Sequence, residues 1–328
     1  MIDCNNEDPL LAIDLGGTKI AAALILTDGE IVAREYIPTL AEEGSETVIR
    51  RMLSTIHSLL SKTDKPRSSF STLAIAAAGA INSEDGIVTV SPNLPGWHDI
   101  PLRDIMKKET GLDTVLINDA SAAALGEHRF GIGRGASNLI YITVSTGIGG
   151  GIIIDGNLYT GVSGSAGEIG HMTIDVNGPL CDCGNTGCLE VFASGKALAR
   201  EAQKAILQGM KTIIIELADG EPNNITAQTV SAAAQKKDEL ALDIISKSAT
   251  YLGVGMVNLV NVFNPEMIIV GGGMSKMGDM LLDTARKVVS ERAFFLPAQK
   301  VRIVPSQLGD NAAVLGAAAF IHGLAKPL

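Results

Sequence analysis

Residues 10–21 read LLAIDLGGTKIA, and this stretch decides the fold class. A short apolar strand, Leu10–Leu15, runs into a Gly-Gly-Thr-Lys turn, and apolar residues resume from Ile20 to Leu26. A second turn at 27–30 leads to a third apolar stretch, Ile31–Ile37. Strand-length apolar runs separated by glycine turns predict a β-meander at the start of the chain.

A similar pattern returns in the middle of the chain. An apolar strand at Leu139–Val144 runs into the glycine-rich turn Ser145–Gly151 and then into Ile152–Ile154. We interpret the two stretches as a weak internal repeat, which indicates two related halves. A third glycine turn, Gly271–Gly273, follows the apolar strand Met267–Val270.

The remaining periodicity predicts an α/β protein of two domains. Further strands are expected at Leu73–Ala78 and Val115–Ile117, and helices at Glu43–Leu60, Ser121–His128, Phe192–Leu207, Asp238–Val262 and Ala312–Leu324. A Pro/Ser-rich linker is missing from the sequence, so the boundary is expected at a hinge near residue 120. We therefore expect a smaller domain of residues 1–119 plus about 311–328, and a larger one of residues 120–310.

Composition excludes several classes of protein. Hydrophobic residues make up 46% of the 328, aromatic residues only 4%, and glycine occurs 36 times, which favours an α/β enzyme over a coiled coil or a disordered chain. The net charge is −10 with dispersed basic residues, so we expect no nucleic-acid partner. We also expect no membrane association, because we see no secretory signal and no apolar run of roughly 20 residues.

Two glycine loops are candidate phosphate-binding sites. Backbone amides in such a loop can approach phosphate oxygens, and Asp14 at the end of the first strand could hold Mg²⁺. An ordinary hairpin turn explains the first loop equally well. The four glycines of Ser145–Gly151 exceed what a turn needs, so a second phosphate loop is favoured there. Gly271–Gly273 would then accept the adenosine end of a nucleotide.

Two polar stretches are candidates for binding and deprotonating an alcohol. Asp119 follows an expected strand, where α/β proteins bind ligands, and a carboxylate can accept a hydroxyl proton during phosphoryl transfer. The commoner explanation of Asn118-Asp119 is a helix N-cap. In the rigid loop Ser91–Trp97, Asn93 can donate to and accept from sugar hydroxyls, although a purely structural loop is the simpler interpretation.

The cysteines predict a metal site. Three of the four lie within eight residues, at 181, 183 and 188, and His171 stands just upstream. Three thiolates and one imidazole form the ligand set of a closed, structural zinc site, which we favour over three buried or redox-active thiols. Thiolates that bind metal need a reducing compartment, so we expect a cytoplasmic protein. The acids Glu168 and Glu190 stand beside these ligands.

These stretches together resemble the ROK family of sugar kinases and repressors, within the actin/hexokinase/Hsp70 ATPase superfamily. The resemblance runs from Ala12 to about Gly316, and its most specific part is Glu168-Ile-Gly-His171 followed by Cys181-x-Cys183-Gly-x-x-Gly-Cys188-x-Glu190. It implies two ribonuclease H-like domains with an interdomain cleft. Relatives are commonly dimers or tetramers, so a homodimer or homotetramer is expected.

The resemblance also implies a role for each matching residue. Asp119 would be the base for the sugar 6-hydroxyl. The sugar would be held by Gly79, Asn93, Asn118, Asp119, Glu168, His171 and Glu190. ATP and Mg²⁺ would be held by Asp14, Gly16, Gly17, Thr18, Lys19, Thr146, Gly147, Gly149, Gly271 and Gly272. Structural Zn²⁺ would be held by His171, Cys181, Cys183 and Cys188. Many relatives have asparagine where this chain has Ser121.

The resemblance favours an ATP-dependent kinase that phosphorylates the 6-hydroxyl of a free hexose. Residues 91–97 are most similar to the glucokinase branch of the family, so glucose is the expected substrate, with N-acetylmannosamine and N-acetylglucosamine as alternatives. The family's repressors carry an N-terminal DNA-binding region before the first glycine loop. Asp14 lies close to the start of this sequence, so a sugar-responsive regulator is the weaker expectation.

Overall fold

The computed structural model describes residues 8–324, and they form two compact units. Unit 1 comprises residues up to Ser137, Gly151–Gly167 and residues from Gln307. Unit 2 comprises Asn138–Gly150 and Glu168–Ser306. Each unit contains a five-stranded sheet with helices packed against it, which confirms the predicted α/β fold class.

The sheet of unit 1 has the strand order β3-β2-β1-β4-β8. Strands β1 and β2 pair antiparallel, as do β2 and β3, whereas β1, β4 and β8 run parallel. The bounds are β1 Leu10–Leu15, β2 Lys19–Ile25, β3 Ile31–Pro38, β4 Thr72–Ala77 and β8 Asp113–Asn118. The meander and both later strands were predicted, with ends that differ by at most a few residues.

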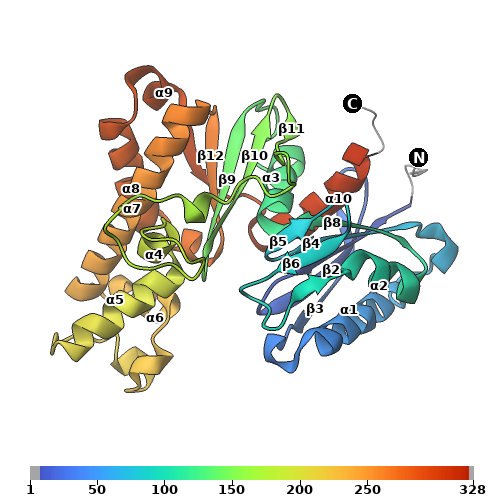
Figure 1. Ribbon diagram of the computed structural model, residues 1–328, viewed down its shortest axis with the longest axis horizontal. Coiled ribbons are helices and arrows are strands. Elements are labelled where there is room, and N and C mark those ends of the chain that lie inside the picture. The colour runs from blue at the N-terminus through green and yellow to red at the C-terminus, as the bar shows by residue number, and fades with distance from the viewer. Residues whose placement is uncertain (1–7, 325–328) are drawn as a thin grey trace. The chain divides into compact units, whose positions relative to one another are not determined.

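Helices cover both faces of this sheet (Figure 1). The alternate residues Leu11, Ile13 and Leu15 of β1 pack with α1 (Ser45–Leu60) and α2 (Leu102–Thr110). The intervening residues Leu10 and Ala12 pack with α10 (Ala312–Leu324), and the adjacent helix is α3 (Asp119–Phe130). Because successive side chains of a strand point to opposite faces, a strand buried on both faces must be apolar throughout.

A small three-stranded sheet extends unit 1 beside β8. Its strands are β5 (Ala80–Asn82), β6 (Ile87–Val90) and β7 (His98–Ile100), and both pairs are antiparallel. The loop between β6 and β7 is residues 91–97, which contain the candidate sugar ligand Asn93. Trp97 is fully buried in the unit 1 core, so this loop is fixed to the domain by an aromatic side chain.

The second sheet repeats the order of the first. Its order is β11-β10-β9-β12-β13, with β9, β12 and β13 parallel and β10 and β11 antiparallel. The bounds are β9 Leu139–Val144, β10 Ile148–Ile154, β11 Asn157–Leu158, β12 Met267–Gly271 and β13 Arg302–Pro305. Position by position, β9 and β10 correspond to β1 and β2, which confirms the internal repeat.

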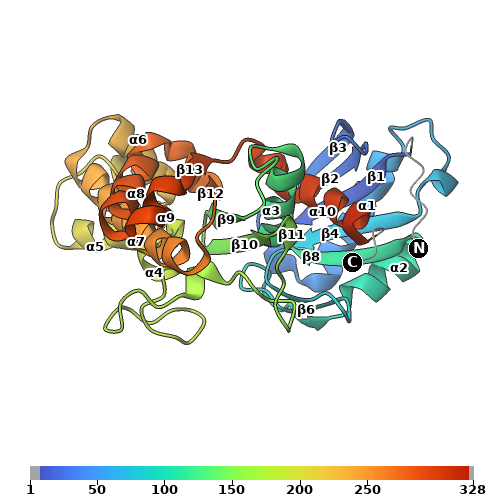
Figure 2. The same cartoon turned by 90° about the horizontal axis from the view of Figure 1, so that it is seen from above.

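Unit 2 contains six α-helices within the described residues, and Figure 2 shows them grouped together. They are α4 Glu190–Ala193, α5 Gly195–Leu207, α6 Ala227–Gln235, α7 Glu239–Phe263, α8 Asp279–Arg292 and α9 Phe295–Lys300. The single helix expected over 192–207 is split, because Ser194 takes an extended conformation and caps α5 through the N–H of Ala197. Helices α6, α8 and α9 were not predicted.

Helix α7 corrects the expectation that the sequence holds no apolar run of roughly 20 residues. It is 25 residues long, and within residues 8–324 it is the helix with the length and composition to cross a membrane. More than half of its apolar window is buried in the protein, where it packs against α8, α6 and α5. A helix that buries its apolar side chains in this way needs no lipid to cover them.

The division between the units differs from the expected boundary near residue 120. Helix α3, which we expected to open the second domain, belongs to unit 1 together with residues 131–137. The reason is its packing against α10: a Cβ on Gly316 would lie 1.6 Å from the carbonyl oxygen of Ala122. The two helix backbones are therefore in direct contact, and α10 lies on the unit 1 sheet.

Candidate active site

The first glycine loop joins β1 to β2 and is tied down by Thr39. The N–H of Gly16 donates to the carbonyl of Lys19 at 3.1 Å and closes the turn. The Thr39 hydroxyl donates to the Gly16 carbonyl (2.7 Å), and the Thr39 N–H donates to the Thr18 carbonyl (2.9 Å). Thr39 is fully buried and was not singled out from the sequence. Two fixed carbonyls hold the loop in one conformation.

Gly17 brings this loop against the candidate sugar ligand. A Cβ at Gly17 would lie 2.6 Å from the carbonyl oxygen of Asn93 and 2.8 Å from its Cβ. A glycine is therefore required here for close approach, and a hairpin turn alone would not require it. Within unit 1, the predicted phosphate loop and the predicted sugar loop touch each other.

Asp14 is held in an unfavourable setting for a negative charge. The pKa of its carboxyl is raised from 3.8 to about 7, chiefly by burial and next by the nearby Asp119 carboxylate. Lys19 acts in the opposite direction, while Asp310 adds to the increase. Two acids close enough to disfavour each other's charge form a typical setting for a divalent cation, so Asp14 and Asp119 fit the Mg²⁺ that was expected here.

The helix cap at the start of α3 is Asn118. Its Oδ1 accepts the N–H of Ser121 at 3.0 Å, while its Nδ2 donates to the carbonyl of Gly79 (3.0 Å) and to Oδ1 of Asp119 (3.2 Å). The N-cap explanation therefore applies to Asn118 and leaves Asp119 as the first residue of the helix. Its Oδ1 also accepts the N–H of Ala120 at 2.8 Å, so the carboxylate has a defined orientation.

Gly79 links this helix to the sugar loop. It has φ = 108°, which favours glycine, and a Cβ there would lie 2.4 Å from the carbonyl oxygen of Val90. Its own carbonyl accepts the hydrogen bond from Asn118. Unit 1 thus gathers the expected ligands Gly79, Asn118 and Asp119 around the start of α3.

In unit 2, Glu190 lies against the second glycine loop. Its Oε2 accepts the N–H of Ile148 at 2.7 Å, and a Cβ at Gly147 would lie 2.4 Å from the same oxygen. The loop itself is closed by the Ser145 N–H, which donates to the Gly147 carbonyl at 2.9 Å. A residue expected to hold sugar therefore contacts a loop expected to hold phosphate, and the sequence spacing gave no sign of this contact.

The four predicted zinc ligands are brought together. The donor atoms of His171, Cys181, Cys183 and Cys188 all lie within 4.8 Å of one another. The Cys181 Sγ lies 3.7 Å from Nδ1 of His171, and the Cys183 and Cys188 sulfurs are also 3.7 Å apart. A tetrahedron with Zn–S bonds of about 2.3 Å has edges of about 3.8 Å, so these residues fit a structural zinc.

The three cysteine thiols differ in how readily they lose their protons. Burial raises the pKa of Cys188 to about 12 and also raises the pKa of Cys181. A backbone N–H from Asn185 lowers the pKa of the exposed Cys183. Buried thiols become thiolates when a metal supplies the positive charge, so metal binding and folding of this loop should be linked.

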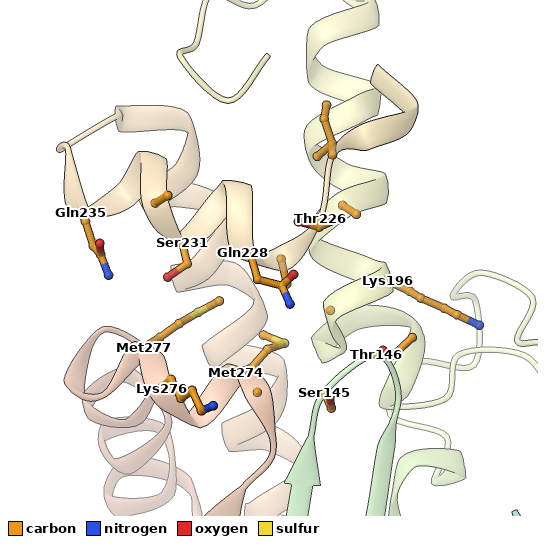
Figure 3. Close-up of a pocket in the computed structure, with 16 residues that line it drawn as sticks. Ser145, Thr146, Lys196, Thr226, Gln228, Ser231, Gln235, Met274, Lys276 and Met277 are labelled. Carbon is orange, nitrogen blue, oxygen red and sulfur yellow. The ribbon is translucent and has the colours of Figure 1, made fainter. Parts of the chain in front are cut away.

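The nucleotide-sized cavity of unit 2 opens beside the second glycine loop (Figure 3). It has a volume of about 560 Å³, within the range of small-molecule sites. Ser145 and Thr146 form one wall, Met274 and Met277 another. Gln228, Ser231 and Gln235 line it from one face of α6. Sequence reasoning missed these residues because α6 was not predicted.

The third glycine turn lies at the edge of this cavity. A Cβ at Gly271 would lie 1.9 Å from the Tyr141 hydroxyl, and one at Gly272 would lie 2.5 Å from the Val144 carbonyl oxygen. Gly272 also has φ = 81°. Both glycines therefore allow close packing against β9, whereas the next residue, Gly273, lines the cavity. The nucleotide role expected for Gly271 and Gly272 stays a prediction.

Three further residues with an expected role are Lys19, Gly149 and Glu168. Lys19 forms an ion pair with Asp310 at 3.9 Å and lies over the Tyr36 ring. Gly149 lies within β10, and Glu168 precedes the 3₁₀ turn Ile169–His171. Lys196, which lines the cavity, pairs with Asp182 of the cysteine loop at 3.3 Å. Cys4 lies outside the described residues.

Comparison with known proteins identifies the family of this chain. The chain matches the ROK family model over residues 10–323. It is 38% identical to a glucokinase of Thermotoga maritima, over 95% of this chain and 96% of that protein. It is 36% identical to a xylose repressor of Caldicellulosiruptor bescii, over 95% of this chain and 77% of the repressor.

A solved structure is similar over the same extent. The crystal structure of a ROK family glucokinase from Streptomyces griseus in complex with glucose and AMPPNP superimposes with a TM-score of 0.85. That protein is 34% identical, and the alignment covers 95% of this chain and 98% of the other. The resemblance inferred from the glycine loops and the cysteine spacing is confirmed: the chain belongs to the ROK family.

Proposed function

We propose that this protein is an ATP-dependent glucokinase that phosphorylates the 6-hydroxyl of glucose. The observation that carries the proposal is the arrangement around α3, where an oriented carboxylate, Asp119, adjoins Asn118 and Gly79. The glucokinase relatives at 36–38% identity support glucose as the substrate. Retention of Asp119 and of both glycine loops favours a kinase over the repressor activity of other relatives.

The roles of the individual residues are those that the resemblance to the ROK family implies. Asp119 accepts the proton of the 6-hydroxyl as that oxygen forms its bond to the γ-phosphorus, and ADP leaves with the electrons of the broken P–O bond. Asn93, Asn118, Glu168, His171 and Glu190 would hold ring hydroxyls of the sugar. The two glycine loops donate backbone N–H groups to phosphate oxygens.

The cofactors have separate tasks. Mg²⁺, held near Asp14, neutralises phosphate charge when bound. His171 and the three cysteines would hold Zn²⁺, which would fix the loop that presents the imidazole. Because Nδ1 of His171 faces the cysteine sulfurs, its Nε2 is left to donate to a sugar hydroxyl. A zinc site of thiolates supports our placement of the protein in the cytoplasm.

A panel of hexoses tests the substrate. Initial rates are measured with Mg-ATP and glucose, N-acetylmannosamine, N-acetylglucosamine, fructose or allose. We expect the highest kcat/KM with glucose. Activity on N-acetylmannosamine without activity on glucose would overturn the assignment. A DNA-mobility assay in the presence and absence of sugar tests the regulator, and sugar-dependent DNA binding without kinase activity would favour it.

The raised pKa of the buried Asp14 carboxyl predicts a measurable change in thermal stability. Replacing Asp14 by asparagine should raise the Tm of the nucleotide-free and magnesium-free protein at pH 8 by a few degrees. The carboxyl has a folded-state pKa of about 7 and an ordinary value of 3.8, so the folded protein binds the extra proton between these values. Stability therefore falls as pH rises from about 4 to 7, and the full penalty applies above pH 7.

Comparing Asp14→Asn with the unaltered protein at pH 4 and pH 8 separates the effect of the buried charge from other effects of the substitution. Near pH 4 the Tm difference between Asp14→Asn and the unaltered protein should largely disappear, because the carboxyl is then protonated in the folded protein. Asp113→Asn, an exposed acid at the start of β8, is the control and should show little change. An equal gain at pH 4 and pH 8 would contradict the role of burial at Asp14.

We also propose that the protein self-associates through an apolar surface of unit 2. Phe294, Phe295 and Leu296 expose 76%, 71% and 68% of their area, and Val262 at the end of α7 is exposed as well. The Phe294 N–H donates to Asn261 of α7 at 2.8 Å, so these residues are neighbours. Such side chains bury roughly 150 Å² each, so the patch amounts to several hundred Å², a large part of one side of a standard interface.

A charged substitution tests this surface. Phe295→Asp should convert the expected dimer or tetramer to a monomer, as measured by light scattering coupled to gel filtration, because a carboxylate cannot be buried in an apolar interface without a partner. Leu207→Asp is the matched control, since Leu207 is equally exposed at the end of α5. A monomeric unaltered protein, or a Phe295→Asp variant of unaltered mass, would refute this interface.

A further inference from the structure

One face of α6 forms a wall of the unit 2 cavity and has no part in the chemistry described above. The opposite face is buried, with Val230, Ala233 and Ala234 at most 3% exposed, and the helix packs against α7 and α5. The face toward the cavity presents three polar residues and two alanines: Gln228, Ser231, Gln235, Ala227 and Ala232. The polar residues are spaced three and four apart, so they form one row along the helix.

The polar side chains of this row are available to a ligand. Within residues 8–324, the amides of Gln228 and Gln235 and the hydroxyl of Ser231 form no hydrogen bond with the protein. The neighbouring Thr226 hydroxyl differs, because it accepts a backbone N–H at 3.3 Å and caps the start of α6. Figure 3 shows the row on the side of α6 that faces the cavity.

The other wall of the cavity is apolar (Figure 3). Met274 and Met277 belong to the 3₁₀ turn Gly273–Met277 and expose only 2% and 7% of their area. Because a 3₁₀ helix has three residues per turn, two side chains three positions apart lie one above the other. The cavity is therefore a slot with a thioether wall on one side and a polar row on the other. Such a slot suits a flat heteroaromatic ring, which packs on the sulfur-bearing side chains and is recognised along its edge.

Both walls of this slot start at the second glycine loop. The Gly195 N–H donates to the Ser145 carbonyl at 2.7 Å, and a Cβ on Gly195 would lie 3.3 Å from that of Ala227, the first residue of α6. A Cβ on Gly273, the first residue of the 3₁₀ turn, would lie 3.7 Å from Oγ of Ser145. Gln235 ends α6 and lies about 12 Å from its start at 1.5 Å per residue. A nucleotide with its phosphates at the loop therefore has its base toward the Gln235 end.

We propose that Gln235 reads the base of the donor nucleotide and selects adenine over guanine. This selectivity rests on the proposed kinase function, in which the cavity holds ATP. One edge of adenine carries an acceptor, N7, beside a donor, the N6 amino group, and a glutamine amide can pair with both. The same edge of guanine carries two acceptors, N7 and O6, so the amide carbonyl would oppose one of them. Ser231, one turn nearer the loop, adds a hydroxyl on the same side of the slot.

Calorimetric binding of Mg-AMPPNP and Mg-GMPPNP in the absence of sugar tests the inference. The unaltered protein should bind Mg-AMPPNP at least about tenfold more tightly, the discrimination typical of one paired base edge. Gln235→Ala removes the amide, so this preference should fall below about threefold through weaker binding of Mg-AMPPNP. Gln235→Arg supplies two donors, which suit the two acceptors of guanine, and should shift the preference at least about tenfold toward Mg-GMPPNP.

Gln208 provides matched controls for both substitutions. It is the exposed C-cap residue of α5, so it resembles Gln235 in type, exposure and place at a helix end, but it is not among the residues that line the cavity. Gln208→Ala and Gln208→Arg should keep the full preference for Mg-AMPPNP. In kinase assays, Gln235→Ala should raise the KM for ATP about tenfold and change kcat less than about threefold, because a contact to the base is equally strong before and during phosphoryl transfer.

Three results would overturn the inference: equal affinity of the unaltered protein for the two nucleotides, a Gln235→Ala variant with full preference, or an equal loss of preference in the Gln208 variants. Failure of both nucleotides to bind would overturn the inference and the nucleotide site together. Selective binding of Mg-AMPPNP that depends on Gln235, without phosphorylation of glucose, would count against the proposed function alone. Phosphorylation of glucose with equal use of ATP and GTP would count against the inference alone.

Discussion

Asp119→Asn should lower kcat by about 10²–10⁴-fold, the contribution typical of a positioned general base. Asparagine keeps the shape of the side chain and can still accept the N–H of Ala120, so the start of α3 should be preserved. Its amide cannot take up the proton of the 6-hydroxyl. Glucose binding, measured by calorimetry, should change little, because the ring hydroxyls are held by other residues.

The control for this prediction is Asp113→Asn, which removes an exposed carboxylate at the start of β8 and should keep full activity. Near-normal turnover by Asp119→Asn would show that another group accepts the proton. A large loss of glucose affinity together with a lowered Tm would show that Asp119 mainly supports the structure at the start of α3.

Cys188→Ser should remove zinc and weaken glucose binding at least about tenfold, the lower end of the effect of disturbing a metal site. Cys188 is fully buried and its sulfur lies 3.7 Å from that of Cys183. Without the fourth ligand, residues 168–190 should lose protection from hydrogen exchange. Binding of AMPPNP should persist, because the cavity beside Thr146 contains none of the zinc ligands.

Metal analysis of the purified protein is the direct measurement for this prediction. Asp182→Asn serves as the control, since Asp182 lies between two ligands and pairs with Lys196 without belonging to the ligand set. It should keep one zinc per chain. If the unaltered protein contains no zinc and binds glucose normally, the structural role of the metal is wrong, although the kinase assignment could stand on the glycine loops and Asp119.

The central strands of the two sheets were predictable because they are buried on both faces. Such strands are continuous apolar runs, as in Leu10–Leu15 and Met267–Gly271, and the glycine turns mark their ends. The small sheet β5-β6-β7 was missed because its strands are short and partly exposed. Helix α6 was missed because it is short and rich in alanine and polar residues, without a clear apolar stripe.

The candidate site was predictable where the residue types and their spacing alone indicate the chemistry. The spacing of Cys181, Cys183 and Cys188 indicates a metal without any tertiary information. Contacts that depend on the fold were not predictable, such as Glu190 with the Ile148 N–H, or Asn93 with Gly17. The domain boundary was misplaced for the same reason, because the packing of α3 on α10 joins segments far apart in sequence.

Phosphorus NMR of the reaction product tests the central claim most directly. The protein is incubated with glucose and Mg-ATP, and the ³¹P spectrum is recorded with proton coupling. The account predicts equal amounts of ADP and a phosphomonoester whose phosphorus couples to the two protons on C6 of the sugar. Release of ADP with inorganic phosphate alone, or a phosphate attached to another carbon of glucose, would contradict it.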